Sequence, residues 1–212
     1  MSHRIRISLS IALLSAALNM VTTASAGISQ TLSGDGLVAA LRQGGYVVVM
    51  RHASSPRETP TKQDANKDNV NVERQLDENG RNSATAMGKA MRDLKIPVGS
   101  VLSSPTYRAL ETVRYAQWVN PQTHPELGDR GQSMQGVSET DGMWIREQTT
   151  KASAGTNTFL VTHMPNISRA FPQAASTADG EMLVFRPDGK GGASLVGRIK
   201  IEDWPRLAAN TK

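Results

Sequence analysis

The sequence predicts an α/β fold, a three-layer α/β/α sandwich with a mostly parallel sheet and an antiparallel edge. Short apolar runs typical of buried strands alternate with segments of helical periodicity, which is the pattern of α/β proteins. Two further strands, at 181–186 and 194–201, follow each other across a Gly-rich turn and predict an antiparallel hairpin. The chain has 212 residues, of which 38% are hydrophobic, and this is enough for one buried core.

Three short segments predict the strands of the parallel part of the sheet. They lie at residues 46–50, 98–103 and 158–162. The first and third lack the polar–apolar alternation of a half-exposed strand. Such runs are typical of parallel strands that helices cover on both faces.

Helical spacing predicts helices at 34–43, at 81–94 and, less regularly, at 139–152. A further helix is expected to begin at Ser104, with that serine as its N-cap and Pro105 at its first position. Residues 53–74 are polar and rich in Asn, Asp and Lys, which predicts a long loop of the kind that often carries function.

The N-terminus has the pattern of a secretory signal peptide. Arg4 and Arg6 precede an apolar run at 7–21, and small residues at 24–26 form a cleavage site. The run is short for a membrane-spanning helix, so the signal peptide is favoured. We expect residues 1–26 to be removed and 27–212 to form a single periplasmic or secreted domain without stable membrane insertion.

The charge and the cysteine content narrow the class of partner. The formal net charge is +5, or +3 once Arg4 and Arg6 leave, and this excess suits an acidic or phosphorylated partner. The basic residues form no stripe or arm, so a nucleic-acid partner is not expected. The chain has no cysteine, which excludes thiol catalysis and cysteine-based metal sites.

Polar side chains follow each of the three central strands. Arg51 and His52 follow the first, Arg108 lies on the helix after the second, and His163 follows the third. Ligands of parallel sheets bind beyond the carboxyl ends of the strands, so these side chains are expected to share one pocket. Guanidinium groups bind phosphate oxygens, and a neutral imidazole can accept a phosphoryl group, which together favour phosphoryl transfer. The N-terminus of the helix after Ser104 would add backbone N–H groups.

Four motifs in one order carry a family resemblance. They are R-H-A at 51–53, L-x-x-x-G-R-x-x-A at 76–84, S-S-P-x-x-R-A-x-E-T at 103–112 and L-V-T-H at 160–163. With these motifs the chain resembles the histidine phosphatase superfamily, which has the phosphoglycerate-mutase-like fold. The signal peptide, the short length and the segments at 163–166 and 180–185 resemble its small periplasmic members.

The resemblance implies roles for five of the site residues. His52 would accept the phosphoryl group, and Arg51, Arg108 and His163 would bind phosphate. Arg57, in the long loop, would be a further phosphate contact. No metal and no cofactor are implied.

The proton donor for the leaving group is a separate question. Larger branches of the family use an acid directly after the second histidine, where this chain has Met164, or a glutamate after the Ser-Ser-Pro helix. Glu181, at a strand start beside the expected site, is the preferred candidate, and Glu111 is expected in a structural ion pair instead. Other acids considered are Glu58, Asp64, Asp68, Glu126, Glu139 and Asp141.

These observations predict a phosphatase that hydrolyses a small phosphomonoester, such as a sugar phosphate, through a phosphohistidine. A mutase is less favoured because the region 119–159 is short for a lid. A non-catalytic periplasmic protein that binds or senses a phosphate ligand is the alternative from another class. A zinc site of His52, His124 and His163 is disfavoured because two arginines are expected in the same pocket.

Overall fold

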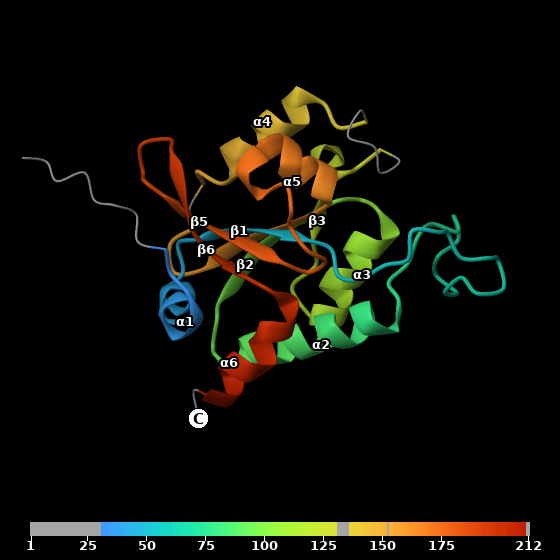
Figure 1. Cartoon of the computed structure of the whole chain (residues 1–212), viewed down its shortest axis with the longest axis horizontal. Helices are drawn as coiled ribbons and strands as arrows, with labels where there is room; N and C mark the ends of the chain where they lie inside the picture. The colour runs from blue at the N-terminus through green and yellow to red at the C-terminus, as the bar shows by residue number, and fades with distance from the viewer. Residues whose placement is uncertain (1–30, 131–135, 152, 211–212) are drawn as a thin grey trace, which may run out of the picture.

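The computed structural model describes residues 31–130, 136–151 and 153–210 (Figure 1). The expected signal peptide at 1–26 lies outside the described residues. A six-stranded sheet in the order β3-β2-β4-β1-β5-β6 has helices on both faces (Figure 1), which confirms the predicted α/β sandwich. No helix within the described ranges is long and apolar enough to cross a membrane.

The sheet is parallel on one side and antiparallel on the other. Its first four strands in chain order run parallel, β5 runs antiparallel to β1, and β6 runs antiparallel to β5. The strands are β1 (Val47–Arg51), β2 (Val98–Ser103), β3 (Gln122–Thr123), β4 (Asn157–Thr162), β5 (Met182–Pro187) and β6 (Ala193–Ile199). Because β1 and β4 lie at the centre, the sequence shows them as continuous apolar runs.

Two groups of helices bury the two faces of the sheet. As drawn in Figure 1, α4 and α5 lie above the sheet, and α1, α2, α3 and α6 lie below it. Along β1 the side chains alternate between the two cores, since Val48 and Met50 pack with one group and Val47 and Val49 with the other. The helices are α1 (Gly34–Gln43), α2 (Glu78–Asp93), α3 (Tyr107–Ala116), α4 (Glu139–Gln148), α5 (Met164–Ala170) and α6 (Trp204–Asn210), with short 3₁₀ helices η1 (Pro125–Leu127), η2 (Pro172–Ala174) and η3 (Ile201–Asp203).

The start of α3 corrects one prediction. The helix begins at Tyr107 with Thr106 as its N-cap, and not at Ser104. Ser104 Oγ instead accepts the backbone N–H of Thr106 at 3.2 Å, which turns the chain before the helix starts. Pro105 therefore lies in the turn that joins β2 to α3.

Three elements escaped sequence analysis because they are short. β3 has 2 residues, and α5 and α6 have 7 each. Elements this short do not show the periodic spacing of apolar residues by which strands and helices are predicted. α2 also begins earlier than expected. Asp77 caps it by accepting the backbone N–H of Gly80 at 2.6 Å.

The long polar loop between β1 and α2 extends away from the sheet (Figure 1). Glu111 on α3 holds it, because its carboxylate accepts the backbone N–H of Leu76 at 2.6 Å and the side-chain amide of Asn66 at 2.8 Å. Glu111 also pairs with Arg114 at 3.2 Å, which confirms the expected ion pair. The loop is therefore anchored to the helix that carries Arg108.

Gly88 generates a prediction for stability. It lies where α2 packs on α3, and a Cβ at this position would overlap the backbone carbonyl of Ala116. Gly88→Ala is expected to lower the free energy of unfolding by about 1–3 kcal/mol, measured by urea denaturation. Gly36→Ala is the matched control, since Gly36 lies in α1 with open space around it. The control is expected to stabilise by about 0.5–1 kcal/mol. Equal effects of the two variants would contradict the packing argument.

Candidate active site

Three strand ends meet at one edge of the sheet. β4 pairs with β1 on one side and with β2 on the other, so the segments that follow these strands are neighbours. His52 follows β1, and its backbone N–H donates to the carbonyl of Thr162 at 3.0 Å. The rings of His52 and His163 lie edge to face with centroids 5.1 Å apart. The sheet order thus brings both histidines together.

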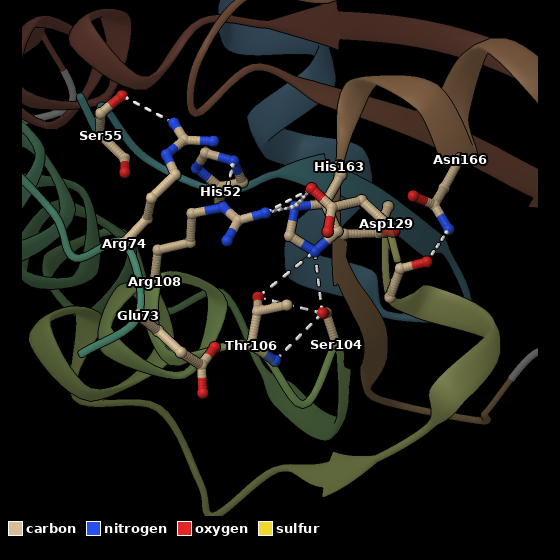
Figure 2. Close-up of polar contacts among 12 residues, drawn as sticks. His52, Ser55, Glu73, Arg74, Ser104, Thr106, Arg108, Asp129, His163 and Asn166 are labelled. Atoms are coloured by element: carbon tan, nitrogen blue, oxygen red, sulfur yellow. Dashed lines mark hydrogen bonds and ion pairs between the residues drawn. The ribbon is translucent and has the colours of Figure 1, made fainter. Parts of the chain in front are cut away.

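His52 has a defined neutral tautomer. Its Nδ1 lies 2.7 Å from the carbonyl oxygen of Ala53, and because a carbonyl only accepts, Nδ1 carries the proton. Nε2 then keeps its lone pair and accepts from Arg108 Nε at 3.2 Å (Figure 2). Burial, reinforced by the charge of Arg108, lowers the pKa of His52 to about 3. At neutral pH its Nε2 is an unprotonated nitrogen in a buried pocket.

His163 lies on the other side of Arg108. Arg108 Nη2 donates to His163 Nδ1 at 3.1 Å, and His163 Nε2 lies 2.8 Å from Ser104 Oγ (Figure 2). Burial, followed by the charges of His52 and Arg108, lowers the pKa of His163 well below its ordinary value. Both rings are therefore neutral, and one arginine bridges them.

Asp129 is a site residue that sequence analysis missed. Its carboxylate pairs with Arg108, and its Oδ2 lies 3.6 Å from His163 Nδ1. It follows η1 in a segment that two side chains hold, since Thr162 Oγ1 donates to the carbonyl of Leu127 at 2.7 Å and Asn166 donates to that of Gly128 at 2.9 Å. This segment has no periodic pattern, so its only signal in the sequence is an acid after the Ser-Ser-Pro helix.

Two cavities that share residues surround this group of side chains. The first, here called the polar lobe, measures about 450 Å³. The second, here called the outer lobe, measures about 430 Å³. Arg74 and Asp129 border both. The polar lobe is lined by Arg51, His52, Ser55, Arg57, Arg74, Asp129, His163, Met164, Pro165 and Asp179, and the outer lobe by Thr59, Glu73, Arg74, Pro105, Thr106, Arg108, Pro125, Gly128, Asp129 and Arg130.

Part of the chain matches a known protein family. The model of one family, the histidine phosphatase superfamily (branch 1), matches residues 47–142. Residues 47–142 of this chain therefore carry the sequence pattern of the histidine phosphatase superfamily. No curated protein sequence matches it.

Solved structures show the same phosphoglycerate-mutase-like fold. The protein histidine phosphatase SixA complexed with tungstate is 16% identical, with a TM-score of 0.54 over 79% of this chain and 99% of that chain. A phosphoserine phosphatase mutant from Entamoeba histolytica in complex with phosphoserine is 11% identical, with a TM-score of 0.50 over 74% of this chain and 98% of that one. At these identities the likeness concerns the fold.

The arginines of this site differ in the number of groups that hold them. Arg51, at the end of β1, pairs with Asp179 at 2.6 Å and donates to the carbonyl of Thr177 at 2.9 Å. Arg57 lines the polar lobe, as expected for a loop arginine. Arg74, which sequence analysis missed, is buried and donates to the backbone carbonyl of Ser55 at 3.0 Å (Figure 2). The loop therefore brings two arginines to the site, and the buried one borders both lobes.

Glu181 does not lie where the expected proton donor would have to be. Its carboxylate pairs with Arg198 at 2.8 Å and accepts the backbone N–H of Ala178 at 2.8 Å. It lines neither lobe, so we assign it a structural role at the start of β5 and correct the earlier prediction. The same absence from both lobes holds for the other acids considered, Glu58, Asp64, Asp68, Glu126, Glu139 and Asp141.

The alternative zinc set is not brought together. His124 stacks on Trp144, with centroids 4.9 Å apart, and lines neither lobe. Within the described ranges, no group of three or more His, Asp or Glu side chains is arranged to hold a metal ion.

The neutral histidines generate a prediction for pH. The pKa of His52 falls from 6.5 to about 3 on folding, so between these values the unfolded chain holds one proton more. The free energy of unfolding should therefore drop as pH falls below 6.5, by about 1.4 kcal/mol per pH unit for each such group.

His52→Gln removes one of these groups and should make the pH dependence shallower by about one proton. Urea denaturation of both proteins between pH 7.5 and pH 5 measures the two slopes. Identical slopes would show that His52 is not buried as a neutral ring.

Proposed function

We propose that this protein is a phosphatase that removes phosphate from a small phosphorylated substrate through a phosphohistidine at His52. The observation that carries the proposal is the state of His52. Its Nε2 is unprotonated, buried in the polar lobe and 3.2 Å from the guanidinium of Arg108. A nucleophile beside fixed positive charge is what phosphoryl transfer requires.

The proposed reaction has two steps. His52 Nε2 attacks phosphorus, the bond from phosphorus to the leaving oxygen breaks, and phosphohistidine forms. Arg51, Arg57, Arg74 and Arg108 offset the charge on the phosphoryl oxygens. Water then attacks phosphorus, the bond to Nε2 breaks, and orthophosphate leaves.

Asp129 is the proposed proton donor for the leaving oxygen. Of the acids in the described part of the chain, it alone borders both lobes. In the structure its carboxylate pairs with Arg108. An arriving phosphate competes with Asp129 for Arg108, which frees the carboxyl group to face the leaving oxygen. The same carboxylate is positioned to take a proton from water in the second step.

The two lobes support a substrate with a small organic leaving group. The phosphate suits the polar lobe, and the outer lobe is the size of a small-molecule site. Pro105 and Pro125 give it apolar walls, while Thr59 and Glu73 offer hydrogen-bonding groups. This mixture suits a sugar phosphate. The tungstate and phosphoserine bound by the two similar proteins also support a small phosphorylated substrate.

We also propose that the protein acts after export, in the periplasm or outside the cell. The signal-peptide pattern at 1–26 supports this location. The second candidate function is a binding or sensing protein that holds a phosphate ligand without turnover. The ion pair between Arg108 and Asp129 favours this second function, because Asp129, the proposed proton donor, is already bound to Arg108.

His52→Ala is expected to abolish turnover and the phosphorylated intermediate together, because it removes the nucleophile. Release of phosphate from p-nitrophenyl phosphate and from a panel of sugar phosphates measures turnover, and acid quenching traps the intermediate. Retained activity in the variant would rule out His52 as nucleophile. Phosphate binding without turnover in the wild type would support the sensing protein.

Asp129→Asn is expected to slow sugar phosphates by about 10²–10⁴-fold, and p-nitrophenyl phosphate much less, because only the poor leaving group depends on protonation. Glu181→Gln is the control and should leave the ratio of the two rates unchanged. Steady-state kinetics with both substrates measures this ratio. A uniform loss on both substrates would contradict the role of Asp129 as proton donor.

A further inference from the structure

Ser104 makes contacts that capping a helix does not explain. It lies in the turn between β2 and α3, is fully buried, and lines neither lobe. Its Oγ lies 2.8 Å from His163 Nε2, 3.2 Å from the backbone nitrogen of Thr106 and 3.1 Å from Thr106 Oγ1 (Figure 2). The hydroxyl therefore has three partners, and one of them is a ring of the active site.

The direction of each hydrogen bond follows from groups that can only donate. Arg108 Nη2 can only donate a hydrogen bond, and it lies 3.1 Å from His163 Nδ1. Nδ1 is therefore the acceptor and carries no proton. The neutral ring must then be protonated at Nε2, which donates to Ser104 Oγ. The backbone N–H of Thr106 donates to the same oxygen, so the hydroxyl proton points to Thr106 Oγ1.

The surroundings of His163 keep the ring neutral. Four other groups face it or act on it: the ring of His52, and the guanidinium groups of Arg108, Arg74 and Arg51. Asp129 Oδ2, 3.6 Å from Nδ1, is the opposing negative charge, and it is already paired with Arg108. A neutral ring has two tautomers, and the partner of each nitrogen decides which one forms.

We propose that Ser104 is a positioning residue that holds His163 as its Nε2–H tautomer and thereby presents Nδ1 to Arg108 and the phosphate site. This role rests on the proposed function, since it concerns the ring beside the nucleophile. Without Ser104 Oγ, Nε2–H keeps only Thr106 Oγ1 at 3.3 Å. The ring then loses its unique orientation, and Arg108 loses a fixed partner.

Ser103 provides a matched control one residue away. It is also fully buried, and its hydroxyl donates to the carbonyl of Ser104 at 3.0 Å. Among the described residues, this hydroxyl makes no hydrogen bond to a histidine ring. Ser103→Ala and Ser104→Ala therefore remove the same atom from neighbouring buried positions, and only the second removes an acceptor of His163.

The experiment compares wild type, Ser103→Ala and Ser104→Ala by the long-range ¹H–¹⁵N spectrum of their histidine rings. The chain has four histidines, so the rings can be assigned. Wild type and Ser103→Ala should show His163 as the Nε2–H tautomer at neutral pH. Ser104→Ala should show a mixture of tautomers and a changed pH titration. It should also bind orthophosphate more weakly and lose about 10–100-fold in kcat/KM, as when other groups that orient a functional histidine are removed.

Two results would overturn the proposal. One is a His163 spectrum and a pH profile that are the same in Ser104→Ala and Ser103→Ala. The other is an Nδ1–H tautomer in the wild type. If Ser104→Ala does not fold, Ser104→Cys keeps a side chain of similar size with a weaker acceptor, and its spectrum should shift partway. If the wild type shows no turnover, the proposed function fails, while the ring spectra still decide the role of Ser104.

Discussion

The buried guanidinium of Arg108 joins the two histidines and Asp129 of the candidate site. It donates to His52 Nε2 at 3.2 Å and to His163 Nδ1 at 3.1 Å, and it pairs with Asp129. A charge in this position is costly unless it is paired and hydrogen-bonded. Each partner must therefore be held in place by the fold. A guanidinium can only donate, so the ring nitrogen that faces Arg108 in each histidine carries no proton.

The order of the strands in the sheet holds the partners of Arg108 in place. β4 lies between β1 and β2, so one histidine comes from each of two neighbouring strands and the arginine comes from the helix after the third. Close approaches of backbone support the arrangement. Gly80 allows α2 to start against the carbonyl of Ser54, and Gly88 allows α2 to pack directly on α3. Gly88 thus helps to fix the helix that carries Arg108, and Gly80 allows α2 to lie against the segment that follows His52.

The long loop between β1 and α2 adds two positively charged side chains, Arg57 and Arg74, to a site formed by residues at the strand ends. Glu111 ties it to α3, and Asp68 pairs with Arg114 on the same helix. These contacts place Arg74 between the two lobes and leave Arg57 on the wall of the polar lobe. Arginines from the loop, added to the side chains at the strand ends, concentrate positive charge beside the two histidines.

The sequence by itself determined the central strands, most helices and the convergence of Arg51, His52, Arg108 and His163, because these depend on local periodicity and on the rule that parallel strand ends meet. It could not identify Asp129 or Arg74, which lie in segments without a period and reach the site only through contacts distant in sequence. It also favoured Glu181, whose carboxylate is taken by Arg198. Only the tertiary structure decided which polar groups share a pocket and which pair with each other elsewhere, since burial strongly favours partners that lie far apart in the sequence.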